Sequence, residues 1–354
     1  MAPVIRELKN HPNRIVTKVC VTAQHRTMLD QTLAVFEVEP DHDLQVMRPN
    51  QRLSDLTAKV LVEMEKVLEL ERPDWVLVQG DTTTSMAAGL AAFYRQTRVG
   101  HIEAGLRTRD KYQPFPEEID RRILDLIADL CFAPTEAARR SLLSEGIRDS
   151  AIRVTGNTVI DALLWVRDRN RRRQPVLPLN LDEVLGNSRI VLITGHRRES
   201  FGKPFETICL AVRELAQFFK NIHFVYPVHL NPNVQDPVRR LLGGLSNVHL
   251  IDPLPYDEFV CMMERASVIL TDSGGVQEEA PSLGKPVLVM REATERPEGI
   301  DAGNARLVRT NRQKIVDETK RLLEDETHYR ASSIARNPYG DGHAARRIVE
   351  ALLE

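Results

Sequence analysis

The first half of the chain has three acidic residues at the end of an apolar segment or at the start of a predicted helix. Asp81 follows VLVQG, Glu103 lies in RVGHIEAG, and Glu117 opens EEIDRRILDLIADL. Alone, Asp81 could cap a helix and Glu117 could simply favour a helix N-terminus. Carboxylates held close together raise one another's pKa, so one could keep a proton while another stays ionised. The three together predict acid–base chemistry.

A glycine pair follows an apolar run in the second half, within LTDSGGVQEEAPSLGKP. Two glycines at a strand-to-helix turn let backbone amides approach an anion, and the helix adds its positive end. Glu278 and Glu279 lie a turn further on, too deep for phosphate, where a carboxylate suits ribose hydroxyls. The alternative is a plain tight turn with surface glutamates. The pattern favours a nucleotide, with its phosphates at Ser273, Gly274 and Gly275.

A basic triplet, His196, Arg197 and Arg198, follows another apolar run in LITGHRRESFGKPFE. By itself such a triplet could be a solvated surface. Directly after a strand, it could instead neutralise a diphosphate leaving group. The residues therefore predict a protein that binds a nucleotide diphosphate, with carboxylates near the group it carries, and they do not name the reaction.

Short apolar runs alternate with helical patterns along the whole chain, and these elements position the residues named above. This alternation predicts parallel sheets covered by helices on both faces. An amphipathic helix is expected at the start, in MAPVIRELKNHP, then a strand at residues 14–23 and a linker at 170–188. The expected fold is α/β, with two doubly wound, Rossmann-like domains facing a cleft. They span residues 1–168 and 169–339, and a helix from about residue 340 to 354 packs back onto the first.

Composition bounds the class of protein. The 354 residues are 42% hydrophobic and 28% charged, with a net charge of −2, so neither nucleic acid nor an anionic membrane is an expected partner. The chain shows no apolar run long enough for a membrane span and no apolar signal-peptide core at its start. Cys20, Cys131, Cys209 and Cys261 lie apart in apolar segments. They predict buried reduced thiols and a cytoplasmic location, with no metal site.

Ten longer motifs occur in order along nearly the whole chain. They are VCVTAQHRTMLDQ, VQGDTTTSMAAGLAAFY, GHIEAGLRT, FPEEIDR, VTGNTVIDALLWVRD, ITGHRRESFG, YPVHLNPNV, LTDSGGVQEEAPSLGKPVLVMR, TERPE and NPYGDG. Together they resemble the non-hydrolysing UDP-N-acetylglucosamine 2-epimerases of bacteria. The resemblance implies a GT-B-like fold, a homodimer, no cofactor, and interconversion of UDP-GlcNAc and UDP-ManNAc. In that reaction UDP is eliminated to leave 2-acetamidoglucal and is then added back.

The resemblance also implies roles for individual residues. Acid–base work would fall to Asp81, Glu103 and Glu117, with His196 at the glycosidic diphosphate. Ser273, Gly274 and Gly275 would receive the diphosphate, Glu279 the ribose, and Arg296 would assist. Some members bind a second UDP-GlcNAc as an activator, and its contacts here would be Gln24, His25, Gln51 and His229.

The chain departs from the resemblance in two places. The family has a first strand and a GTRPEAIK-type loop ahead of the segment MAPVIRELK, so a chain without them is expected to be less stable and less active. Asp120 stands where the family usually has asparagine, beside Arg121 and Arg122, either of which could pair with it. Three alternatives stay open: a GT-B glycosyltransferase, a hydrolysing epimerase, and an inactive UDP-sugar-binding protein.

Overall fold

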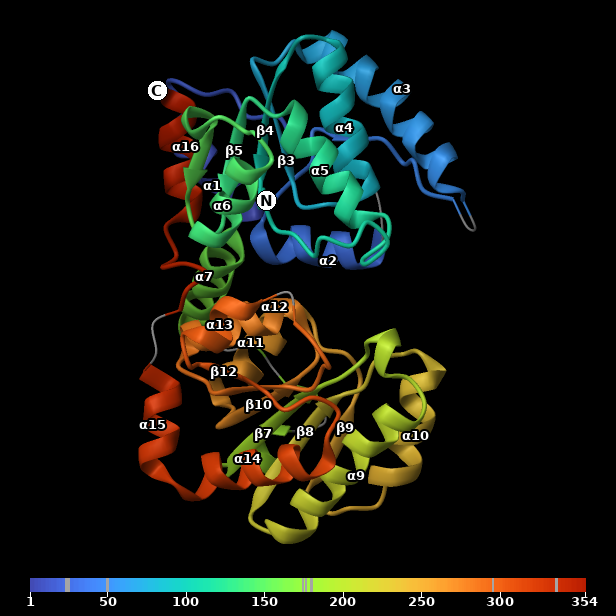
Figure 1. The fold of residues 1–354 in the computed structure, drawn as a ribbon, viewed down its shortest axis with the longest axis vertical. Coiled ribbons are helices and arrows are strands. Elements are labelled where there is room, and N and C mark those ends of the chain that lie inside the picture. Colours follow the sequence, from blue (N-terminus) through green and yellow to red (C-terminus); the bar gives the residue numbers. More distant parts are fainter. Residues whose placement is uncertain are drawn as a thin grey trace. The chain divides into compact units, whose positions relative to one another are not determined.

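The chain forms two compact units in the computed structural model, which describes all residues except 23–25, 49–50, 174, 176, 179–180, 295 and 335–336. One unit is Met1–Ala162 with Gly340–Glu354, and the other is Leu163–Tyr339 (Figure 1). The sequence-based boundary after residue 168 stays a prediction, because helix α7 (Thr158–Arg172) runs unbroken through both positions. Within the described part of the chain, no helix is long and apolar enough to cross a membrane.

The first unit contains a four-stranded parallel sheet in the order β3-β4-β5-β6 and a separate parallel pair, β1-β2. Its strands are β1 (Cys20–Val21), β2 (His42–Asp43), β3 (Trp75–Gln79), β4 (Arg98–Ile102), β5 (Leu130–Ala133) and β6 (Ile152–Val154). Its helices, besides the start of α7, are α1 (Ala2–Lys9), α2 (Arg26–Phe36), α3 (Leu53–Glu71), α4 (Thr83–Tyr94), α5 (Glu117–Ile127), α6 (Glu136–Ser144) and α16 (Ala344–Leu353).

The first and last helices of the chain pack against each other in this unit (Figure 1). Val4 and Leu8 of α1 share one buried cluster with Ile348 and Val349 of α16, which confirms the predicted amphipathic N-terminal helix. Asp161 accepts hydrogen bonds from two backbone amides at the start of α16, which fixes that end of the helix.

The strand predicted at residues 14–23 is much shorter in the structure. Among its described residues, 14–22, only Cys20–Val21 forms a ladder, with His42–Asp43 of β2, and Val16 is 86% exposed. Apolar, β-branched residues favour an extended backbone, but a strand also needs a neighbour to accept its hydrogen bonds. The sequence pattern therefore overstates the length of this strand.

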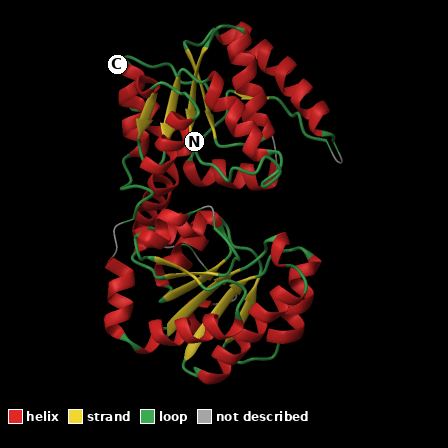
Figure 2. Cartoon of the chain, in the orientation of Figure 1, coloured by secondary structure: helices red, strands yellow, loops and turns green. Residues whose placement is uncertain are grey.

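The second unit is one parallel sheet of six strands in the order β12-β11-β10-β7-β8-β9, with helices on both faces (Figure 2). Its strands are β7 (Arg189–Thr194), β8 (Ile222–Pro227), β9 (Val248–Ile251), β10 (Val268–Thr271), β11 (Val287–Val289) and β12 (Ala305–Leu307). Its helices are the end of α7, α8 (Leu181–Leu185), α9 (Lys203–Phe218), α10 (Pro232–Leu242), α11 (Tyr256–Arg265), α12 (Gly274–Glu279), α13 (Pro297–Asp301), α14 (Arg312–Glu324) and α15 (Glu326–Ile334). The strand order reverses between β7 and β10, where a doubly wound sheet binds its ligand.

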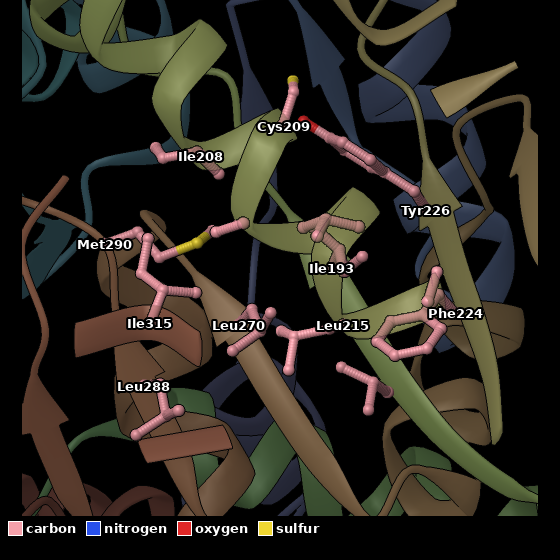
Figure 3. Packing of buried hydrophobic residues seen from close by; sticks show 14 of the residues in the cluster. Ile193, Ile208, Cys209, Leu215, Phe224, Tyr226, Leu270, Leu288, Met290 and Ile315 are labelled. Atoms are coloured by element: carbon pink, nitrogen blue, oxygen red, sulfur yellow. The ribbon is translucent and has the colours of Figure 1, made fainter. Parts of the chain in front are cut away.

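The core of the second unit holds one of its candidate loops in place. Figure 3 shows Phe224 of β8 and Leu270 of β10 beside Leu215 of α9, and Tyr226 of β8 beside Cys209 of the same helix. The hydroxyl of Tyr226 donates a hydrogen bond of 2.9 Å to the carbonyl of Gly195, the residue before His196. The α/β prediction is confirmed, and in this unit the core anchors a loop at a strand end.

Candidate functional site

Asp81 and Glu103 follow the ends of neighbouring strands in the first unit. Gln79 and Ile102, the last residues of β3 and β4, are register partners. A Cβ built on Gly80 would lie 3.6 Å from Glu103 Oε2, so the Glu103 carboxylate lies against the turn that leads to Asp81. The structure thus brings these two predicted residues together.

Arg121 of α5 joins the two residues. Its Nη1 donates to the backbone carbonyl of Glu103 at 2.6 Å, and its Nη2 donates to Asp81 Oδ2. Glu103 has φ 69°, a left-handed conformation that is costly for a side chain other than glycine and that gathers at functional sites. From the sequence, Arg121 was only a candidate partner of Asp120. No local sequence pattern indicated that its side chain would contact the ends of two strands.

Glu117 and Asp120 lie in the first turn of α5, near the same residues. Glu117 Oε2 is buried and has no hydrogen-bond partner within the described structure. Asp120 accepts a hydrogen bond of 2.9 Å from Thr83 Oγ1, whereas Arg122 pairs with Glu145. Burial raises the pKa of Asp120 to about 6; the Thr83 hydrogen bond lowers it, and the charges of Glu117 and Asp81 raise it. A fourth carboxyl, Asp120, thus holds its proton to a higher pH than an ordinary aspartate, and the sequence analysis noted this residue only as a departure from the family.

In the second unit, Asp272 organises the loop that carries the basic triplet. The residue is fully buried, and its Oδ2 accepts hydrogen bonds from the backbone amides of His196 and Arg197 at 2.7 and 2.8 Å. Asp272 Oδ1 has no hydrogen-bond partner in the described part of the chain and lies 3.5 Å from His196 Nδ1. Asp272 had no predicted role, although this residue lies at a strand end close to the glycine pair.

His196 stacks on His229, with ring centroids 5.4 Å apart and ring planes 12° from parallel. Burial lowers the pKa of His196; Asp272 raises it, and Arg197 and His229 lower it further. A lowered pKa favours the neutral imidazole at neutral pH. Positive charge in this loop therefore comes from the arginines, and Arg197 Nε is buried with no hydrogen-bond partner among the described residues.

The glycine-rich turn lies beside Glu279, which is buried. A Cβ built on Gly275 would lie 3.9 Å from Glu279 Oε2 and 4.0 Å from Ser273 Oγ, so both oxygens face the bare glycine. The hydroxyl of Tyr256 donates to Glu279 Oε1. Burial raises the pKa of Glu279 to about 7; the Tyr256 hydrogen bond lowers it, and the charge of Glu278 raises it.

Glu278 is buried too, and it forms an ion pair with Arg296 through Oε1 and Nε. The alternative of a plain turn with surface glutamates is therefore wrong, since Glu278 and Glu279 are only 3% and 5% exposed. Arg296 is held further by Tyr339, whose hydroxyl donates to the Arg296 carbonyl at 3.0 Å. The predicted Arg296 thus lies next to the helix that begins with the glycine pair.

The predicted activator contacts are placed only in part. Gln24 and His25 lie outside the described residues. Gln51, in the first unit, accepts a hydrogen bond from the backbone amide of Arg48 at 3.1 Å, and His229, in the second, stacks on His196. This set stays a prediction.

Known proteins are similar to this chain over nearly its whole length. Residues 6–353 match the family described as UDP-N-acetylglucosamine 2-epimerase. The protein of that name from Escherichia coli K12 is 54% identical over 355 residues, which cover 99% of this chain and 94% of the relative. The Neisseria meningitidis UDP-GlcNAc 2-epimerase, in a crystal structure bound to UDP-GlcNAc, has a TM-score of 0.90 and 48% identity, covering 100% of this chain and 95% of that one. The Methanocaldococcus jannaschii enzyme, in complex with UDP-GlcNAc and UDP, has a TM-score of 0.80 and 32% identity, covering 99% and 95%. The predicted resemblance is confirmed, and the chain belongs to the UDP-N-acetylglucosamine 2-epimerase family.

Proposed function

We propose that this chain interconverts UDP-GlcNAc and UDP-ManNAc by inverting C2 of the sugar. The observation that carries the proposal is the acidic cluster around Arg121, where Asp81, Glu103 and Glu117 come together at the ends of β3 and β4 and the start of α5. The named relatives supply the substrate class. A plain nucleotide-binding domain would have no need of this cluster.

The reaction proceeds by elimination and re-addition. A carboxylate removes the proton from C2, the C–H electron pair becomes the C1=C2 double bond, and the C1–O bond breaks so that UDP leaves with its electrons. The intermediate is 2-acetamidoglucal. A carboxylic acid then protonates C2 from the opposite face while UDP oxygen bonds to C1 again. This route avoids a free carbanion at C2, where no adjacent ketone would stabilise it.

The acidic cluster suits the two proton transfers, since they need one ionised and one protonated carboxyl group. Asp81, Glu103 and Glu117 are proposed as the acid–base set. Asp120, with its raised pKa, lies within their electrostatic reach and would modulate their protonation.

The second unit is proposed to hold UDP. Ser273, Gly274 and Gly275 would receive the diphosphate, with Arg296 assisting and His196 at the glycosidic phosphate. The ribose would lie at Glu279, whose Oε2 faces Gly275. UDP held by these groups stays available for re-addition, as the mechanism requires.

If Glu279 binds the ribose, uridine affinity is expected to rise with pH. In the free protein Glu279 is protonated below about pH 7, and ribose hydroxyls donate preferentially to the ionised carboxylate, so binding releases a proton. Affinity should be about tenfold higher near pH 8 than near pH 6. Uridine is the probe because it lacks phosphates that titrate in this window.

Calorimetric titration of uridine at several pH values provides the measurement. Glu279→Gln removes the titrating group and is expected to flatten the dependence, which separates Glu279 from His196. A wild-type affinity that stays constant across the window would exclude an ionisation-linked contact between Glu279 and the ribose.

A second UDP-GlcNAc at Gln24, His25, Gln51 and His229 is proposed as an activator. Binding at such a site makes the rate depend sigmoidally on UDP-GlcNAc concentration. A hyperbolic dependence over the same range would count against it.

The chain is further proposed to act as a homodimer in the cytoplasm. Leu70, Tyr94 and Leu126 are 72%, 67% and 76% exposed and stand at the ends of three successive helices, α3, α4 and α5, which pack side by side. Apolar surface of this kind marks interfaces, and sedimentation of a monomer at micromolar concentration would contradict the dimer.

The four cysteines are free thiols, as suits a reducing compartment such as the cytoplasm. Recovery of the protein from the periplasmic fraction would contradict the cytoplasmic location.

Proton NMR of UDP-GlcNAc incubated with the protein in deuterated water tests the activity. UDP-ManNAc should appear, with deuterium at C2 of both sugars. Free ManNAc with UDP would indicate a hydrolysing epimerase. UDP binding without exchange would leave a UDP-sugar-binding protein, and transfer of GlcNAc only when an acceptor is added would indicate a glycosyltransferase.

A further inference from the structure

A series of ionisable side chains, buried from Arg107 inward, lies behind Asp81 in the first unit. His101 of β4 is completely buried, with Nδ1 2.7 Å from Asp125 Oδ1 and Nε2 2.8 Å from the carbonyl of Gly80. Asp125 Oδ2 accepts a hydrogen bond of 2.6 Å from Arg107 Nη2. Arg107 also pairs with Glu145 at 2.7 Å, and Glu145 with Arg122 at 3.2 Å. Basic and acidic groups alternate along this series, which ends at the carbonyl oxygen of Gly80.

The geometry determines where the protons lie on His101. A carbonyl oxygen can only accept, so Nε2 carries a hydrogen toward Gly80. On the other side, Asp125 accepts from Arg107 and from the Gly105 amide at 3.3 Å, which favours the carboxylate. Burial raises the pKa of Asp125, but the hydrogen bonds and charges of His101 and Arg107 hold it below its usual range. Nδ1 must therefore donate as well.

The ring holds the turn that leads to Asp81. Gly80 has φ 76°, its amide donates to the Ile102 carbonyl at 3.0 Å, and its carbonyl accepts from His101. We propose that His101 is kept as an imidazolium, with both nitrogens protonated, and that it is a positioning residue for Asp81. The positioning role rests on the proposed function of Asp81; the protonation state does not.

Two amide substitutions separate the two contacts. The side-chain amide of His101→Asn can donate near the Nδ1 position, toward Asp125, and leaves the Gly80 carbonyl without a donor. His101→Gln can donate near the Nε2 position and keeps the contact with Gly80. Misplacement of a reacting group by about 1 Å can cost about 10²-fold in rate. We expect His101→Asn to lower kcat by about 10- to 100-fold with little change in KM, and His101→Gln to retain about fivefold more of kcat than the asparagine variant.

NMR of protein labelled with ¹⁵N in its histidine rings reads the protonation state directly. The His101 signals, assigned by their loss in His101→Gln, should show two N–H groups at neutral pH. A ring with one protonated nitrogen overturns the inference, whatever the enzyme does. Equal losses of kcat in the two variants, in step with lowered thermal stability, overturn the positioning role. If the unaltered protein showed no turnover, the proposed function and the positioning role would both be overturned. The inference that the ring is doubly protonated would still be decided by NMR alone.

Discussion

Glu117→Gln is expected to lower kcat for UDP-GlcNAc epimerisation by about 10²–10⁴-fold, the range that a positioned acid or base contributes. The carboxylate is held at the first turn of α5 among Asp81, Glu103 and Asp120, and its buried Oε2 has no partner within the described residues that could make it merely structural. Glutamine has the same shape but cannot act as a general acid or base, so the fold and UDP affinity should persist while turnover is lost. Asp81→Asn is expected to lower kcat in the same way, although it also removes the ion pair with Arg121.

Glu136→Gln is the matched control, because Glu136 opens α6 in the same unit as Glu117 opens α5. Its carboxylate is exposed and lies 3.6 Å from Arg139 in a surface pair, so turnover should stay within about twofold of wild type. Initial rates and UDP titrations on all three variants check this. Near wild-type turnover in Glu117→Gln would remove Glu117 from the acid–base set.

Gly105→Ala is expected to destabilise the protein by about 2–5 kcal/mol and to lower activity. Gly105 has φ 82°, where an alanine costs about 1–2 kcal/mol. Its Cβ would also lie 2.4 Å from the Ala138 carbonyl oxygen and 2.8 Å from Leu142 Cγ, and overpacking of this kind costs about 1–3 kcal/mol more. The backbone must then move away from α6. Because Glu103 is two residues earlier, its carboxylate would be displaced.

Gly146→Ala is the control that separates the steric clash at Gly105 from the cost of a positive φ for alanine. Gly146 has φ 89°, and a Cβ there would have nothing within 4 Å. Denaturant unfolding should show a loss of only about 1–2 kcal/mol for this variant, with activity unchanged. If the two alanine variants were equally stable, contact between Gly105 and α6 would not be what requires glycine.

Much of the fold and the candidate site could be predicted from local patterns. Apolar runs alternating with helical periodicity indicate parallel α/β units, and residues after such runs are delivered to the ligand-binding edge of a sheet. Asp81, Glu103 and the glycine pair could be singled out for this reason. The family resemblance added the substrate and the mechanism, which spacing alone did not provide.

The sequence by itself thus determined the α/β class, the family and the segments that carry the chemistry. Only the tertiary structure decided which side chains meet: Arg121 with Asp81, 40 positions apart, and Asp272 with the His196 amide, 76 apart. It also decided that the pKa of Asp120 is raised, since that shift is caused mainly by burial. Periodicity is a property of neighbouring residues, whereas such pairings depend on the order of the strands in the sheet, which no local pattern encodes.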